Sequence, residues 1–144
     1  IPLRLVGSEM CIRDRSNIDV QVYNALDKDD SLVGKADIVI ADLPCSGLGI
    51  MGRKPDIRYN ISPEKISDII RLQRDILEVV SMYVKPGGTL VYSTCTINRS
   101  ENEDNADWIC TSLGFTRDGE YVQMLPSPDK DNDGFFVARL IKNS

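Results

Sequence analysis

The stretch ADIVIADLP (36–44) decides the fold class of this chain. Its apolar centre is rich in β-branched residues and has an aspartate on each side, which is typical of a strand buried on both faces of a parallel sheet. A second apolar run, TLVYSTC (89–95), also ends in polar residues and a cysteine. The segment between the two runs has helical periodicity, and strands that alternate with helices predict an α/β fold with a parallel sheet.

Two helices are predicted from their end signals. Ser62 and Pro63 begin the first one, as an N-cap residue and a proline at the first helical position, and the glycines of KPGG (85–88) end it. Ser100 and Glu103 have the spacing of a capping box that begins the second. The inward face of the first helix is predicted to hold Ile66, Ile69, Ile70, Gln73, Leu77, Val80 and Val84, and that of the second Ala106, Ile109, Cys110 and Leu113.

Further strands are predicted on both sides of this central part. IDVQVYNA (18–25) alternates apolar and polar residues. FTRDGEYVQML (115–125) and FFVARLIK (135–142) are joined by an acidic turn, and together they predict an antiparallel hairpin at one edge of the sheet. The turn resembles the first half of a calcium loop, but its twelfth position is Leu140 in place of a glutamate, so we predict no metal site.

The first fifteen residues, IPLRLVGSEMCIRDR (1–15), show neither a helical nor a strand period. They resemble translated sequencing-adapter read-through. We therefore expect two parts, a non-native segment at 1–15 and a domain over 16–144.

Composition narrows the function further. The chain has 144 residues, enough for one domain, with 42% hydrophobic and 27% charged residues and no apolar run long enough to cross a membrane. Four cysteines without a secretion signal indicate reduced thiols and a cytoplasmic protein, for which a monomer is the favoured state.

The absence of histidine excludes Ser-His and Cys-His hydrolases. The net charge of −5 argues against a free-standing nucleic-acid binder, but a catalytic domain held to nucleic acid by another part remains open.

Cys45 and Cys95 follow the two apolar runs at matching positions. Ligands of open α/β sheets bind outside the carboxyl ends of the strands, so two neighbouring strands would bring both thiols to one cleft. Free cysteine is also among the most buried residue types, and packing is the alternative explanation. The residues alone leave both explanations open.

The Asp-Leu-Pro-Cys motif at 42–45 and the Thr-Cys-Thr motif at 94–96 together resemble those of a known family. With their surroundings, ADIVIADLPCSGLGIMGRKPDIRYN (36–60) and LQRDILEVVSMYVKPGGTLVYSTCTINRSENED (72–104), they resemble the RNA 5-methylcytosine methyltransferases of the Nol1/Nop2/Sun family, closest to the bacterial Sun-type branch that acts on 16S ribosomal RNA. The resemblance extends from about residue 18 to the C-terminus. It implies a Rossmann-like class I methyltransferase fold with S-adenosyl-L-methionine as cofactor and ribosomal RNA as substrate.

The resemblance also implies roles for particular residues. Carbon 5 of cytosine is a poor nucleophile until a thiolate adds to carbon 6, and the family's nucleophile matches Cys95. Cys45 matches the cysteine that helps release the product, and Asp42 matches an aspartate in contact with cytosine and cofactor. The further expected contacts are Asn24 and Pro44 with the cofactor and Arg53 with RNA.

Some features of the family pattern are missing from this sequence. Neither its glycine-rich cofactor loop nor the acidic residue after that loop is present, and Asn24 stands where the family often has aspartate. We therefore expect residues 16–144 to be the C-terminal part of the methyltransferase domain, inactive alone. Two alternatives remain: methylation of transfer RNA, and a non-catalytic α/β RNA-binding module whose cysteines only pack.

Overall fold

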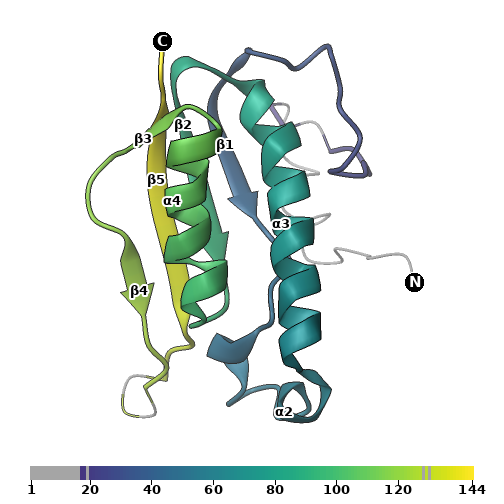
Figure 1. Cartoon of the computed structure of the whole chain (residues 1–144), viewed down its shortest axis with the longest axis vertical. Coiled ribbons are helices and arrows are strands. Elements are labelled where there is room, and N and C mark those ends of the chain that lie inside the picture. The colour runs from purple at the N-terminus through teal and green to yellow at the C-terminus, as the bar shows by residue number, and fades with distance from the viewer. Residues whose placement is uncertain (1–16, 19, 128, 130) are drawn as a thin grey trace.

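The computed structural model describes residues 17–18, 20–127, 129 and 131–144 (Figure 1). The predicted division of the chain into residues 1–15 and 16–144 falls at a position outside these ranges. It stays a prediction, because residues 1–16 lie outside the described part of the chain.

One sheet runs through the described residues, with strand order β1-β2-β5-β3 and with β4 also paired to β5. β1 and β2 are parallel, and β5 runs antiparallel to β2, β3 and β4. The α/β class and the antiparallel strands toward one edge are therefore as predicted. The strand bounds are β1 (Ala36–Asp42), β2 (Val84–Thr94), β3 (Phe115–Arg117), β4 (Val122–Met124) and β5 (Phe135–Lys142).

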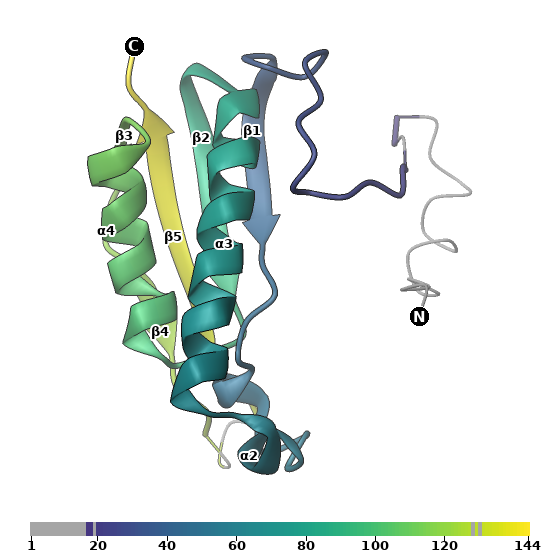
Figure 2. The ribbon, with the colours of Figure 1, turned by 45° about the vertical axis from the view of Figure 1, so that its right-hand side comes forward.

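Both long helices lie on the same face of this sheet (Figures 1 and 2). α3 (Pro63–Tyr83) connects β1 to β2, and α4 (Glu103–Ser112) connects β2 to β3. Ser62 caps α3 as predicted, because its side chain accepts a hydrogen bond from the Lys65 amide at 3.3 Å. The short helices are η1 (Leu48–Ile50), α2 (Ile57–Asn60) and η2 (Arg99–Glu101).

The hydrophobic core lies between the two helices and the sheet. Tyr92 of β2 and Phe136 of β5 are fully buried and meet edge to face, with ring centroids 6.0 Å apart. Burial of each large apolar side chain stabilises the fold by about 1.5–3 kcal/mol. The largest fully buried aliphatic side chains among the described residues are Leu77, Val84, Leu90, Ile109 and Leu140.

The opposite face of β1 is open, which corrects the prediction of a strand buried on both faces. Ile38 is 62% exposed and Ile40 is 72% exposed, whereas Ala41 is buried. The reason is that α3 and α4 lie on one face of the sheet, and no helix of the described residues covers the other face (Figure 2).

The prediction of a strand at 18–25 is wrong. The residues that the structure describes in this range lie outside any strand. An alternating pattern forms a strand only beside a partner, and Val22 is fully exposed. The segment that follows is held to the end of α3. Asp29 N–H donates to Tyr83 Oη at 2.9 Å, and Gly34 N–H donates to Met82 O at 2.9 Å.

Two helix-end predictions also need correction. The predicted capping box does not form, because η2 intervenes and α4 begins only at Glu103. Ser100 N–H instead donates to Asn98 Oδ1 at 3.2 Å, and Glu103 Oε2 is buried without a hydrogen-bond partner. The glycines of 85–88 lie within β2, since α3 already ends at Tyr83.

The single strand predicted at 115–125 is divided into β3 and β4. Gly119, between them, has φ of +85°, a left-handed conformation that interrupts an extended chain. Both halves still pair with β5.

Candidate active site

The two strands that end in cysteine motifs are neighbours in the sheet. Asp42, the last residue of β1, pairs in parallel register with Ser93 of β2. Parallel strands end at the same edge, so the residues that follow them meet there. Cys45 Sγ lies 3.1 Å from Cys95 Sγ, and both thiols are free and half-buried.

Burial, and after it the hydrogen bond with Cys95, raise the pKa of the Cys45 thiol to about 12. Cys45 is therefore protonated at neutral pH. Its S–H group can therefore donate the hydrogen bond toward the sulfur of Cys95.

Asp42 is exposed at the same edge of the sheet, three residues before Cys45. Its Oδ1 accepts a hydrogen bond from Ser93 Oγ at 2.9 Å, which fixes the carboxylate at the end of β1. An exposed carboxylate held in this way is open to a ligand that carries N–H donors.

The loop after β1 is tied closely to the end of β2. Leu43 N–H donates to Ser93 O at 3.2 Å, and Gly49 N–H donates to Cys95 O at 3.1 Å. A Cβ at Gly49 would lie 2.5 Å from Gly134 O and 2.8 Å from Cys95 O, so only glycine fits. The structure thus holds three backbone segments in direct contact beneath the thiols.

A cluster of buried polar side chains under the two cysteines was missed by the sequence interpretation. Glu101, Gln73 and Asn105 are all fully buried, and each makes hydrogen bonds within the cluster. The signal was the run ENE (101–103), in the segment that follows the Thr-Cys-Thr motif, which the sequence interpretation read as a helix start.

Pro44 and Arg53 are also near this edge. Pro44 is exposed, and its carbonyl oxygen accepts from Gln73 Nε2 at 2.9 Å. Arg53 pairs with Asp133 at 3.2 Å, and both line a hollow of about 280 Å³ together with Gly49, Gly52, Pro126, Ser127, Asp131 and Asn132. The Arg53 side chain is largely exposed, so it is accessible to a polyanion.

The structure does not place Asn24 near Cys45 and Cys95. Its side chain accepts from Leu26 N–H at 3.3 Å, within the segment that contacts Tyr83 at the C-terminal end of α3. Gln73, which touches Pro44, precedes Tyr83 by ten residues, or about 15 Å along a helix. The structure therefore separates Asn24 from the thiols.

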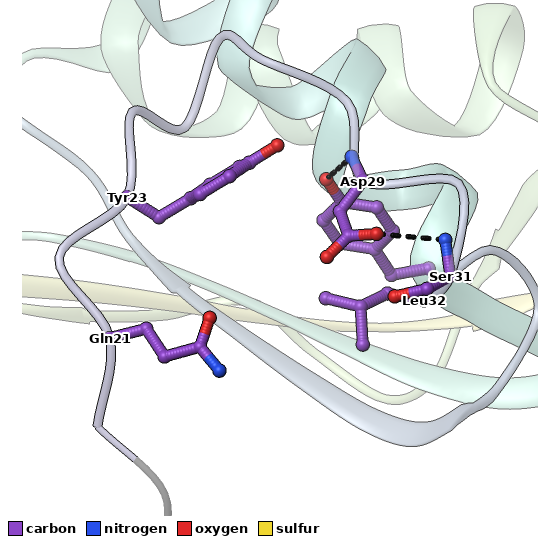
Figure 3. A pocket seen from close by; sticks show the side chains of 6 residues that line it. Gln21, Tyr23, Asp29, Ser31 and Leu32 are labelled. Atoms are coloured by element: carbon purple, nitrogen blue, oxygen red, sulfur yellow. Dashed lines mark hydrogen bonds between the residues drawn. The ribbon is translucent and has the colours of Figure 1, made fainter.

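A second hollow, of about 360 Å³, lies on that same distant segment (Figure 3). Tyr23 and Gln21 stand on one side of it, and Asp29 and Ser31 stand on the other. Tyr83 also lines the hollow, and its Oη accepts the hydrogen bond from Asp29 N–H. The hollow has no contact with either cysteine.

Among the described residues, no helix has the length and apolar character needed to cross a membrane. Nor does this part of the chain gather three or more metal-ligating side chains.

Residues 9–141 match the family model described as 16S rRNA methyltransferase RsmB/F. The ribosomal RNA small subunit methyltransferase F of Salmonella paratyphi A is 40% identical over 129 residues, a match that covers 75% of this chain and 26% of that protein. The protein of the same name from Salmonella arizonae is 40% identical over 126 residues, with the same coverage. The chain thus spans 26% of the length of these curated relatives.

Solved structures show the same fold. The crystal structure of PH0851 superimposes with a TM-score of 0.69 at 32% identity, covering 85% of this chain and 30% of that one. NSun6 from Pyrococcus horikoshii, crystallised with SFG, gives a TM-score of 0.77 at 24% identity, covering 100% of this chain and 40% of that one. The Rossmann-like methyltransferase fold predicted from the sequence is confirmed.

Proposed function

The chain belongs to the 16S rRNA methyltransferase RsmB/F family, and from this premise we propose that the whole protein methylates carbon 5 of a cytosine in ribosomal RNA. The observation that carries the proposal is the 3.1 Å contact between Cys45 Sγ and Cys95 Sγ, beside Asp42 at the carboxyl edge of β1 and β2. A thiol pair next to a fixed carboxylate suits nucleophilic activation of a pyrimidine.

Cys95 is the nucleophile in this proposal. Its thiolate adds to carbon 6 of a cytosine that has left its base stack, and the ring becomes nucleophilic at carbon 5. The S–H group of Cys45 donates to the Cys95 sulfur and stabilises the thiolate before the attack. Asp42, anchored by Ser93, hydrogen-bonds the cytosine edge as the thiolate adds.

Release requires loss of the proton on carbon 5. The C–H electron pair then forms the carbon 5–carbon 6 double bond, and the carbon–sulfur pair returns to Cys95 as the thiolate leaves. Cys45, as a thiolate, accepts the proton in this step. Once the Cys95 sulfur is bonded to carbon, its contribution to the raised pKa of Cys45 is lost, so Cys45 deprotonates more readily in the adduct than in the free protein.

S-adenosylmethionine supplies an electrophilic methyl group when it is bound. Asp42 and Pro44 fit this cofactor, because both are exposed at the edge where ligands of α/β sheets bind. Asn24 does not join them in this structure, and we keep its cofactor contact only as a prediction.

The non-catalytic alternative fits the site less well. Cysteines that only fill space need not meet one another, whereas Cys45 Sγ and Cys95 Sγ lie 3.1 Å apart although 50 positions separate them. The names of the family and of the Salmonella relatives favour ribosomal over transfer RNA. We further propose that the whole protein acts in the cytoplasm as a monomer, with Arg53 in contact with RNA.

Three variants of the whole protein test this function. Cys95→Ala is expected to abolish methylation, and Cys45→Ala is expected to accumulate a covalent protein–RNA adduct that survives denaturing electrophoresis. Cys110→Ala, which removes a half-buried thiol of α4, is the control and should retain methylation. Unchanged methylation in Cys95→Ala would show that the nucleophile is assigned wrongly.

A further inference from the structure

Glu101 is a fully buried carboxyl group beneath the two thiols, and the proposed reaction gives it no role. Burying an ionisable side chain costs free energy unless hydrogen bonds compensate for the lost water. The hydrogen-bond partners of Glu101 therefore indicate its role.

Four donors reach the two oxygens of Glu101. Ser46 Oγ and Asn98 Nδ2 donate to Oε1 at 2.6 and 3.0 Å. Ser46 N–H and Gln73 Nε2 donate to Oε2 at 2.8 and 3.3 Å. Only an ionised carboxylate accepts on both oxygens without donating, so the cluster is built around that form.

The donors connect the two cysteine loops. Because Ser46 Oγ–H is given to Glu101, the hydrogen bond of 2.8 Å between Ser46 Oγ and Thr96 Oγ1 must be donated by Thr96. Ser46 directly follows Cys45, and Thr96 directly follows Cys95. The relay Thr96 to Ser46 to Glu101 thus joins the residues next to both thiols.

The same carboxylate also reaches the other side of Cys45. Gln73 Nε2 donates both to Glu101 and to the carbonyl oxygen of Pro44, the residue before Cys45. Glu101 therefore fixes the backbone on each side of Cys45 and one residue beyond Cys95.

We propose that Glu101 is a positioning residue that holds the Cys45 and Cys95 thiols in contact by binding both of their loops at once. It touches neither sulfur and acts through Ser46, Thr96 and Gln73. Its importance for turnover rests on the proposed methyltransferase function, but its effect on the thiol pair does not.

An amide cannot replace this carboxylate. Glutamine would place an N–H group against one of the donors, and neither neighbouring amide can turn to accept it. The Gln73 oxygen already accepts from Asn105 Nδ2 at 2.8 Å, and the Asn98 oxygen already accepts from Ser100 N–H at 3.2 Å. Glu101→Gln is consequently a sharp test that keeps the size of the side chain.

The test measures how readily the two thiols form a disulfide. Oxidised glutathione takes two electrons from Cys45 and Cys95, which lose their protons and join, and is itself reduced to two glutathione thiols. Mass spectrometry of peptides identifies the 45–95 bond, and the equilibrium constant reports how closely the thiols are held. Glu101→Gln should lower this constant about tenfold, since each hydrogen bond to a buried charge changes an equilibrium by at least that factor.

Glu103→Gln is the matched control, because Glu103 lies two residues away and its Oε2 has no hydrogen-bond partner. It should leave the equilibrium constant of disulfide formation within about twofold of the wild-type value, within the usual effect of a substitution away from a hydrogen-bond network.

Urea unfolding establishes that each variant is folded. If Glu101→Gln does not fold, Ser46→Ala and Thr96→Val break the relay one link at a time, and each should lower the constant. A folded Glu101→Gln, or folded relay variants, with the wild-type constant would overturn the proposal, as would an equal loss in Glu103→Gln.

Methylation by the whole protein separates this inference from the proposed function. If Cys95→Ala leaves methylation unchanged while Glu101→Gln weakens the disulfide, the function is wrong and the positioning role stands. If Cys95→Ala is inactive while Glu101→Gln keeps the wild-type disulfide constant, the function stands and the positioning role is wrong.

Discussion

Cys45 Sγ and Cys95 Sγ lie 3.1 Å apart although the two residues are separated by 50 positions in the chain. The distance is longer than the roughly 2.05 Å of a disulfide bond, so each sulfur keeps its own chemistry. The contact follows from the parallel register of β1 and β2, in which Asp42 pairs with Ser93 just before the two loops begin. Each thiol is therefore part of the other's environment.

The first prediction concerns the protonation of Cys45. Alkylation by iodoacetamide requires the thiolate, so its rate should rise about tenfold per pH unit below the pKa. Because the pKa is raised to about 12, the rate at Cys45 should still be rising at pH 10. In Cys95→Ala the hydrogen bond that contributes to the raised pKa is gone, and the profile should level off at a lower pH. Mass spectrometry of the Cys45 peptide measures both profiles.

The same raised pKa predicts the sign of a stability change. The folded state holds the Cys45 proton more tightly than the unfolded state, whose pKa is near the ordinary value of 9.0. This stabilisation is complete below pH 9 and is lost as the pH rises toward 12. Cys45→Ser should weaken the decline of the free energy of unfolding between pH 9 and 11, as measured with urea. An unchanged slope in that variant would contradict the assignment.

The third prediction tests the close contact at Gly49. A Cβ there would meet Gly134 O at 2.5 Å and Cys95 O at 2.8 Å, and backbone atoms cannot move aside cheaply. Gly49→Ala should lower the free energy of unfolding by about 1–3 kcal/mol, the usual cost of overpacking. Gly52→Ala is the control, since a Cβ at Gly52 has open space and should change stability by no more than about 1 kcal/mol. Equal stability of the two variants would contradict the argument.

The fourth prediction concerns the anchor of Asp42. Ser93 is buried and donates its hydroxyl hydrogen bond to the Asp42 carboxylate. Ser93→Ala should lower kcat/KM for methylation by the whole protein about three- to tenfold, because the carboxylate loses its fixed orientation, and should cost at most about 1.5 kcal/mol of stability. Ser67→Ala, at an exposed position of α3, is the control and should leave kcat/KM unchanged. If Ser93→Ala had the kcat/KM of the original protein, the hydrogen bond from Ser93 to Asp42 would not be needed to orient the carboxylate.

The features that sequence reasoning predicted correctly are those set by local chemistry. Ser62 is the N-cap of α3 and Pro63 is its first residue, so these two residue types alone were enough to predict where the helix begins. The meeting of the two cysteine loops followed from the rule that parallel strands end at one edge of a sheet, together with the single helix between them.

The features that it missed depend on contacts between distant segments. The burial of Glu101 requires donors from Ser46, Gln73 and Asn98, and no local pattern shows that these residues will converge. The alternating run at 18–25 is a strand pattern without a partner strand among the described residues. The apolar run of β1 predicted burial on both faces, but burial depends on which helices pack against it.

The last prediction follows from that open face. Ile38 and Ile40 are 62% and 72% exposed and lie on one side of β1, and Ile40 is paired with the half-buried Val91. Contiguous exposed apolar surface promotes association. Ile38→Thr with Ile40→Thr keeps β-branched side chains that suit a strand and should reduce self-association of this chain in sedimentation velocity. The free energy of unfolding should change by less than about 1 kcal/mol, because little buried area is lost.

Val39→Thr supplies the contrast on the covered face of the same strand. Val39 packs against the core, so this change places a hydroxyl group there and should lower the free energy of unfolding by about 1–3 kcal/mol. It should leave self-association of the folded chain unchanged, because the open face keeps both isoleucines. If the double variant at Ile38 and Ile40 associates as strongly as the original chain, then this face of β1 is not the surface through which copies meet.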